Sequence, residues 1–279
     1  MGDRALALGL AGFLLAAAHA AGIAAERTPT ADVFIDGSVP LNFTDDRYGN
    51  PQGHADYLTS PYLRMSLNGR LVPSLHYALY ASGGFDKYPS RADADSTFAT
   101  LGGSLTKRWG EFRLGFSLER NHAYDGVFGP FLYVAHDLGS YASYLYTDAA
   151  KVVRIKPAVS ISRRFSDDAS QESYVASFKV DLERKLADRW WVTLTPRIRY
   201  QNFLGGENLG REDTIYSIST GLRYSINDNI GVSSSVGWER RTSNVPGRNF
   251  DSFGAGISLD FSHTFGMPDD DTFDKRRRR

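Results

Sequence analysis

The chain has 279 residues, and its 32 basic and 32 acidic side chains give a formal net charge of zero. This balance gives no reason to expect a nucleic acid as a partner. The sequence has no cysteine, which excludes disulfide bonds, thiolate chemistry and a lipid anchor on an N-terminal cysteine.

The N-terminus has the features of a targeting segment. Arg4 precedes an apolar run at residues 5–18, which is too short for a membrane span, and small-residue cleavage sites follow at Ala20 and near Ala25. We predict that residues 1–25 are a secretory signal peptide; an uncleaved N-terminal anchor helix is the alternative. No later stretch approaches the roughly 18 apolar residues of a transmembrane helix, so any membrane contact must come through strands.

Between about Asp32 and Phe265, apolar and polar residues alternate in long segments that come in pairs. This period of two indicates strands with one apolar and one polar face. The segments exceed the roughly 5–6 residues of a typical soluble strand and match the about 9–11 residues of a tilted membrane-spanning strand. Twelve strands are predicted, at residues 32–44, 59–69, 72–84, 96–107, 110–121, 134–146, 151–164, 173–186, 190–203, 213–226, 229–241 and 249–265.

The connections between these segments alternate in length. Tight joints such as residues 68–70 and 227–228 alternate with longer polar joints such as residues 85–95 and 204–212. Outer-membrane barrels have short periplasmic turns and longer external loops. We therefore predict an all-β fold, a transmembrane antiparallel up-and-down β-barrel of about 12 strands, formed by residues 26–265 in the cell outer membrane.

Some local features are unfavourable to regular strands. Pro40, Pro157 and Pro196 fall inside predicted strands, and each removes a donor from the hydrogen-bond ladder. We expect bulges or strand ends at these prolines. The segment around Pro40 could alternatively form a plug or a periplasmic tether, and residues 122–146 alternate poorly.

The alternation also predicts which face meets lipid. In the segment from Ser173 to Leu186, Tyr174 and Phe178 share the apolar parity, and Lys179 and Asp181 share the other. Aromatic residues of the apolar parity gather near strand ends, as in interfacial girdles. We expect the apolar face outside and the charged face inside; a secreted soluble β-protein would invert this arrangement. The girdle residues are Tyr174, Tyr200, Tyr216 and Trp238 near the long loops, and Phe112, Trp190, Tyr224 and Phe265 near the short turns.

The last strand, Ile257 to Phe265, is apolar at nearly every second position and closes on a phenylalanine. It resembles the C-terminal assembly signal of Gram-negative outer-membrane β-barrel proteins, and the hairpin at residues 236–251 looks like the last hairpin of porin-like barrels of unassigned role. The resemblance implies that the barrel-assembly machinery is a partner and reads Leu259, Phe261 and Phe265. The signal would have to work internally here, because residues 266–279 follow it.

The tail at residues 266–279 combines three successive aspartates with four terminal arginines. It is too charged to pack, so we predict a disordered periplasmic end. Its arginines could touch an anionic cell-wall polymer or a lipid headgroup, or the tail could be inert.

The polar parity supplies the candidate site. Among the charged residues of this parity, which also include Glu119 and Asp260, bases outnumber acids by roughly two to one, and a basic wall in a narrow pore lowers the barrier for anions. The predicted lumen-lining and solute-binding residues are Arg64, Arg113, Arg154, Lys156, Lys179, Asp181, Glu183, Arg197, Arg199 and Arg223.

These residues predict a passive diffusion channel for small, anionic solutes. The architecture is similar, at the level of the fold, to twelve-stranded arginine-lined channels for acidic oligosaccharides. In the alternative, the charges neutralise one another and the barrel is a plugged structural scaffold. The predicted partners are outer-membrane lipid and lipopolysaccharide, the assembly machinery and small anionic solutes or oligosaccharides.

An outer-membrane lipid hydrolase is the third possibility, because such enzymes use histidines with hydroxyl and acidic groups at the lipid-facing rim. The sequence has no Gly-x-Ser-x-Gly elbow, and we assign no catalytic residue, cofactor or metal ligand. Asp45-Asp46 and Asp93-x-Asp95 do not complete an oxygen cage for Ca²⁺. The histidines weighed for an enzyme are His54, His76, His122, His136 and His263, with His54 and His122 expected in outer loops.

Overall fold

The structure is a computed structural model that describes residues 31–44, 56–89 and 92–265. The predicted signal peptide and charged tail lie outside these residues. No helix in the described part of the chain has the length and apolar character needed to span a membrane. The strands are β1 (Ala31–Thr44), β2 (Asp56–Thr59), β3 (Tyr62–Val72), β4 (Leu75–Asp86), β5 (Ser96–Trp109), β6 (Phe112–Asp125), β7 (Phe131–Tyr144), β8 (Tyr146–Thr147), β9 (Val153–Ser166), β10 (Ser173–Ala187), β11 (Trp190–Phe203), β12 (Glu212–Ser225), β13 (Ile230–Ser243) and β14 (Phe250–Phe265).

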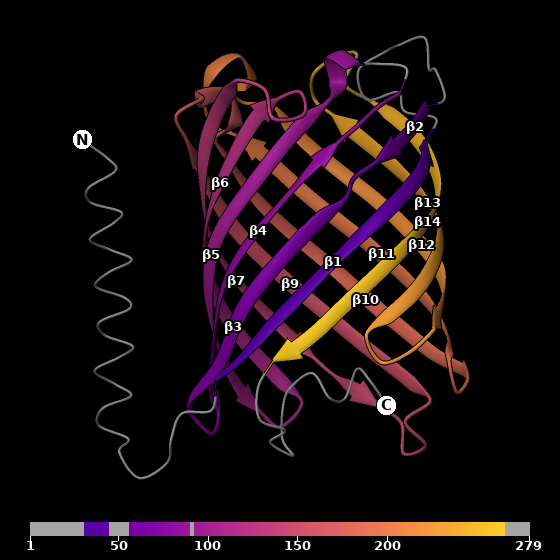
Figure 1. The fold of residues 1–279 in the computed structure, drawn as a ribbon. Helices are drawn as coiled ribbons and strands as arrows, with labels where there is room; N and C mark the ends of the chain where they lie inside the picture. Colours follow the sequence, from indigo (N-terminus) through magenta and orange to yellow (C-terminus); the bar gives the residue numbers. More distant parts are fainter. Residues whose placement is uncertain (1–30, 45–55, 90–91, 266–279) are drawn as a thin grey trace.

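Twelve long strands form a closed antiparallel barrel, and β2 and β8 are short additions to it (Figure 1). Each long strand pairs with the next one along the chain, and β14 pairs with β1 to close the wall. The predicted twelve-stranded barrel is therefore confirmed. Residues 122–146, which alternate poorly, contain the end of β6 and all of β7, and β7 starts earlier than predicted, at Phe131.

The two ends of the barrel differ. Tight joints lie at one end, here called the short-turn end, together with Ala31 and Phe265 (Figure 1). The longer connections lie at the other end, here called the long-loop end, and include three short 3-10 turns, η1 (Ala92–Ala94), η2 (Ala169–Gln171) and η3 (Gly206–Asn208). An even number of strands returns both ends of the barrel chain to the short-turn end, which corresponds to the periplasmic side of such barrels.

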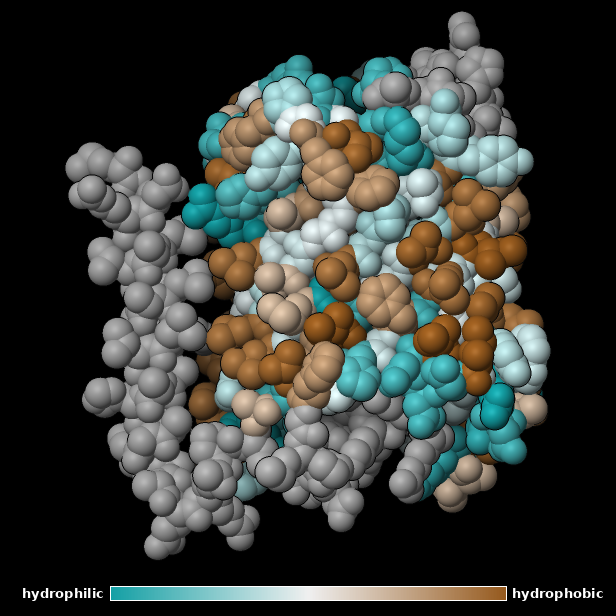
Figure 2. Space-filling view, in the orientation of Figure 1, coloured by the Kyte–Doolittle hydropathy of each residue, from teal (hydrophilic) through white to brown (hydrophobic). Residues whose placement is uncertain are grey.

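The apolar face of the strands is outside. Tyr174 and Phe178 on β10 are 55% and 46% exposed, whereas Ser173, on the opposite parity, is fully buried. Figure 2 shows apolar side chains spread over the outer wall between more hydrophilic ends. Because a soluble barrel would bury these side chains in its lumen, the exposed apolar surface makes this a membrane-spanning barrel of the outer-membrane type.

The prolines do not produce the expected bulges. Pairing continues in one register through Pro157, and the β7–β9 ladder ends one residue beyond it, at Ala158. Pro196 interrupts the β10–β11 ladder, which resumes in the same register. Neither proline lies in a bulge of these ladders. The end of the β7–β9 ladder beside Pro157 fits the other expectation, a strand end, whereas β11 continues through Pro196. Pro40 lies opposite residues 60–61, where the break between β2 and β3 falls.

The closing seam joins β1 to β14. Leu259, Phe261 and Phe265, the residues of the predicted assembly signal, all face outward on β14. Phe261 lies opposite Gly37, where an added Cβ would stand 2.5 Å from the aromatic ring. The glycine therefore allows the ring to lie across the seam.

Candidate functional site

The strand register places the predicted lumen residues on the inner wall. Each has the parity opposite to the exposed apolar side chains of its strand. Eight of them lie on four adjacent strands: Arg154 and Lys156 on β9, Lys179, Asp181 and Glu183 on β10, Arg197 and Arg199 on β11, and Arg223 on β12. Arg64 on β3 and Arg113 on β6 are not part of this group. The eight residues on β9 to β12 are here called the β9–β12 wall.

The carboxylates of the β9–β12 wall are paired with bases. Lys179 Nζ lies 3.1 Å from Asp181 Oδ2, and Arg154 Nη1 lies 3.7 Å from Glu183 Oε2. Lys156 stands directly opposite Asp181 on the neighbouring strand. The negative charge of this wall is therefore locally neutralised.

Three arginines of the same wall differ from these pairs. Within residues 31–44, 56–89 and 92–265, Arg197, Arg199 and Arg223 have no ion-pair partner. Arg197 faces Lys179 directly across the β10–β11 ladder, and two like charges in this position repel each other. The Nε atom of Arg199 is buried without a hydrogen-bond partner. This arrangement leaves positive charge that a mobile anion can neutralise.

A cavity of about 320 Å³ lies next to Arg197, along β12–β14 and the end of β1. Small side chains create it, and Ser217 at its edge stands directly opposite Arg197. Its inward-facing lining residues are Asn42, Thr44, Ser217, Ser219, Ser235, Gly237, Glu239, Ser252 and Gly254. The basic β9–β12 wall of the lumen therefore lies next to a wall of small side chains.

The sequence analysis missed several charged residues of the inner wall. The additional residues named below are four acids and four bases, so they do not remove the predicted surplus of bases. They have the same inward parity as the predicted residues, but lie near strand ends or in the poorly alternating segment. The additional acids are Asp36, Asp137, Asp213 and Glu239, and the additional bases include Arg70, Arg108, Arg164 and Arg241.

The part of the lumen that runs from β9 round to β3 carries a polar network. Arg164 donates to both carboxylate oxygens of Asp137, from Nε at 2.8 Å and from Nη2 at 2.7 Å. Tyr80 donates to Glu119, and the guanidinium of Arg64 lies 4.2 Å from the centre of the Tyr80 ring. The carboxylates of Asp137 and Glu119 are thus bonded to neighbouring side chains, which suits a structural role, whereas Arg64 Nε is buried without a hydrogen-bond partner.

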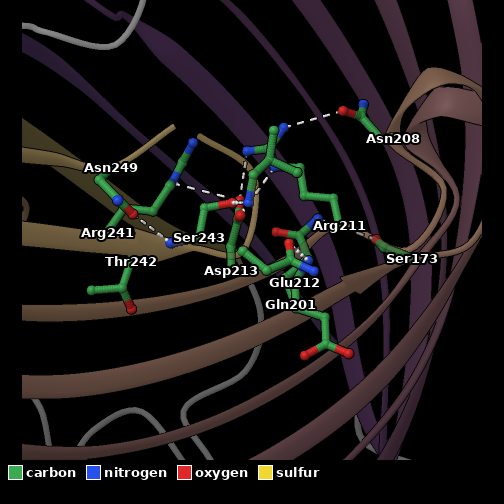
Figure 3. A network of polar contacts seen from close by, with 12 residues as sticks. Ser173, Gln201, Asn208, Arg211, Glu212, Asp213, Arg241, Thr242, Ser243 and Asn249 are labelled. Carbon is green, nitrogen blue, oxygen red and sulfur yellow. Dashed lines mark hydrogen bonds and ion pairs between the residues drawn. The ribbon is translucent and has the colours of Figure 1, made fainter. Parts of the chain in front are cut away.

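A second network joins the loops at the long-loop end to the wall (Figure 3). Arg211 donates from Nε to Asp213 Oδ1 at 3.0 Å and from Nη2 to Oδ2 at 2.5 Å, and Arg241 Nε lies 3.7 Å from Asp213 Oδ2. Asp213 is 1% exposed. Asn208 accepts from Arg211 Nη1 at 3.2 Å and donates to the Ser170 carbonyl at 3.0 Å, which ties η2 to η3.

Among the described residues, His122 does not form a catalytic group with a hydroxyl and a carboxylate. His122 lies within β6 rather than in an outer loop, which corrects the expectation, and its Nε2 accepts from Arg120 Nε at 3.0 Å. In the part of the chain that the structure describes, no hydrogen bond joins His122 to a serine or a carboxylate. His76 faces inward on β4, His136 and His263 face outward, and His54 lies outside the described residues.

The acidic loop residues are held by protein groups. Among the described residues, no group of three or more His, Asp or Glu side chains could hold a metal ion. Lys87 Nζ lies 2.5 Å from Asp95 Oδ2, and the Tyr88 N–H donates to Oδ1 at 2.8 Å. Burial would raise the pKa of Asp95, but these two hydrogen bonds outweigh it and hold that pKa below its ordinary value. Asp45 and Asp46 lie outside the described residues.

Comparisons with known proteins show similarity of the fold. No family model matches the sequence, and no curated protein matches it. An outer membrane channel from Pseudomonas putida F1 is similar, with a TM-score of 0.55 at 14% identity over 85% of this chain and 97% of that one. The anion-selective porin from Comamonas acidovorans gives 0.43 at 10% identity, over 85% and 100%. The KdgM porin in complex with disordered oligogalacturonate gives 0.45 at 11% identity, over 81% and 99%.

Proposed function

We propose that this barrel is a passive diffusion channel of the outer membrane for small anionic solutes. The observation that carries the proposal is the presence of three arginines without ion-pair partners, Arg197, Arg199 and Arg223, in the described lumen wall next to a small-residue cavity. A solute that passes this point meets uncompensated positive charge.

The acids of the lumen do not contradict this preference. The acids are neutralised by nearby bases and hydroxyls, so they repel an anion less than their number suggests. The carboxylates with an ion-pair partner within 4.0 Å are Asp137, Asp181, Glu183 and Asp213. Asp260, also on the inner wall, accepts hydrogen bonds from Ser233 and Ser258 at 2.8 Å each.

A plugged structural barrel is the second candidate, and the networks around Asp137 and Asp213 favour it. Both networks fill parts of the inner wall with paired charges, as in small barrels whose side chains fill the lumen. The similarity to a protein described as an outer membrane channel supports the first candidate only through the shared fold.

Planar-bilayer recording of the refolded full-length protein separates the two candidates. A channel gives stepwise current, and under a KCl gradient its reversal potential shifts in the direction set by chloride. Addition of a small dicarboxylate to one side should then reduce the chloride current by competition. Absence of current at protein concentrations that give inserted, protease-resistant barrels would refute the channel; current with a potassium preference would refute the anionic solute class.

A further inference from the structure

Two opposite charges of the lumen lie near each other without forming an ion pair. Arg223 on β12 and Asp260 on β14 both face inward, and only β13 lies between their strands (Figure 1). Within residues 31–44, 56–89 and 92–265, neither side chain has an ion-pair partner within 4.0 Å. Neighbouring strands are about 4.8 Å apart, so the backbones that carry the two charges are roughly 10 Å apart.

The side chain of Arg223 extends from β12 over β13. Its direct neighbours across the two ladders, Trp191 on β11 and Ser233 on β13, are uncharged. A Cβ added to Gly231 would lie 3.6 Å from Arg223 Nε, so the arginine passes over this glycine. Gly231 stands directly opposite Asp260, and its lack of a side chain keeps the space between the two charges open. Arg223 is exposed in the lumen, where a solute can contact it.

Hydroxyl groups hold the carboxylate of Asp260. Ser233 Oγ donates to Oδ2 and Ser258 Oγ donates to Oδ1, each at 2.8 Å. The direct neighbours of Asp260 across its two ladders, Gly231 and Ser38, carry no charge. An ionised carboxylate has about four acceptor positions, so two hydroxyl bonds leave it able to accept further hydrogen bonds from a cation.

Small side chains lead from the lumen cavity to these two charges. The cavity of about 320 Å³ lies on the same strands, nearer to the long-loop end, and Ser219 and Ser235 line it. On β12 the inward residue between Ser219 and Arg223 is Gly221. A solute that occupies the cavity can therefore reach Arg223 without passing a bulky side chain on this strand.

The separation of the two charges favours a solute that carries both signs. A simple anion is attracted by Arg223 but repelled by Asp260, and a simple cation is attracted and repelled in the reverse order. A zwitterion can place its carboxylate on the guanidinium and its ammonium on the aspartate, and so form a charge-assisted hydrogen bond at each end. The protein itself does not provide these bonds, because the two side chains do not contact each other.

We propose that Arg223 and Asp260 form a binding site for small zwitterions, with α-amino acids as the solute class. The carboxylate of the amino acid binds the Arg223 guanidinium, its ammonium binds Asp260, and its side chain lies toward the small-residue cavity. The inference rests on the proposed function in one respect, that the solute enters through the lumen. It adds a solute class to the simple anions that Arg197 and Arg199 attract.

A saturation-transfer NMR titration of the refolded full-length protein in a non-ionic detergent tests the site. The probes are alanine, which carries both charges, propionate, which lacks the ammonium, and ethylammonium, which lacks the carboxylate. The site variants are Arg223→Gln and Asp260→Asn. The matched control is Arg240→Gln with Asp251→Asn, an exposed outward pair whose members stand directly opposite each other on β13 and β14. The heat-modifiable shift on gels verifies that each variant is folded.

We expect alanine to bind the wild-type protein and the control equally, and each site variant at least about fivefold more weakly. Asp260→Asn should at the same time strengthen the binding of propionate, which damage to the barrel would not do. If propionate binds the wild-type protein as tightly as alanine does, the site is a simple anion site and the proposal is overturned. An equal loss of alanine binding in the control would show that the effect is nonspecific and would also overturn it.

The same protein in planar bilayers separates the failure of this site from the failure of the channel. Alanine binding by a protein that gives no current would refute the channel and support the site. Current without alanine binding would refute the site and leave the channel in place.

Discussion

Reversing the charge of Arg197 and Arg199 should convert an anion preference into a cation preference. Both side chains lie on the inner wall of β11 and have no ion-pair partner among the residues that the structure describes. Their replacement therefore removes charge that acts on the solute instead of breaking a pair. Arg197→Glu with Arg199→Glu changes each site from +1 to −1, so four unit charges change.

The size of the effect follows from the cavity beside them. A sphere of 320 Å³ has a radius of about 4 Å, which places an ion at its centre roughly 8 Å from a guanidinium on the neighbouring strand. At that distance one unit charge changes the electrostatic energy of the ion by about 0.2 kcal/mol in water at physiological salt, and by about 0.8 kcal/mol at an effective dielectric constant of about 20 with the same salt screening. Four unit charges therefore disfavour an anion by about 0.8 to 3 kcal/mol and favour a cation equally.

The permeability ratio of chloride to potassium should thus fall at least about tenfold in the double variant, since about 1.4 kcal/mol corresponds to a factor of ten. The reversal potential under a KCl gradient measures this ratio directly. Arg240→Glu, an exposed outward change on β13, carries the same kind of charge change and should leave the reversal potential unchanged. A double variant with the wild-type reversal potential would remove these arginines from the permeation path.

Three further outcomes are expected. In Gly237→Leu the new side chain enters the lumen cavity with ordinary contacts at Cβ (3.5 Å or more), so it should lower the single-channel conductance without changing the sign of the ion selectivity. An unchanged conductance would show that the cavity is not on the permeation path. Asp213→Ala leaves Arg211 and Arg241 without their buried carboxylate and should lower the free energy of unfolding in urea by about 3 kcal/mol. The control Asp228→Ala, at an exposed position, should not lower it, and equal urea midpoints for the two variants would contradict the prediction. Because the pKa of Asp95 is lowered in the folded protein, its hydrogen bonds stabilise the loop fully above the ordinary pKa of about 4 and are lost as the pH falls through the lowered pKa. Asp95→Asn should therefore speed hydrogen exchange at the Tyr88 amide at pH 7 and have little effect near pH 2. An equal effect at both pH values would refute the ion pair with Lys87.

The functional candidates could be predicted only in part. Parity identified inward-facing bases such as Arg197 and Arg199, because the direction of a side chain on a strand depends on its position alone. Parity could not identify which bases are paired. Asp137 and Arg164 are 27 residues apart, and Arg211 belongs to a connection that the alternation does not describe. Parity also missed lumen acids such as Asp137, because they lie where the alternation is weak.

Local pattern alone therefore determined that this chain crosses a membrane as a barrel of about twelve strands, and which face of each strand meets lipid, because a period of two and a length near ten residues are properties of single segments. Only the tertiary structure decided the register at which the strands meet and the path of the loops. Those relations between distant segments leave Arg197, Arg199 and Arg223 without ion-pair partners among the described residues, place small residues of β12–β14 next to Arg197, and fasten the β6–β7 loop to β5 through Phe128 and Thr97. Ion pairs and cavities form between segments that the sequence keeps far apart, so no window of the sequence contains them.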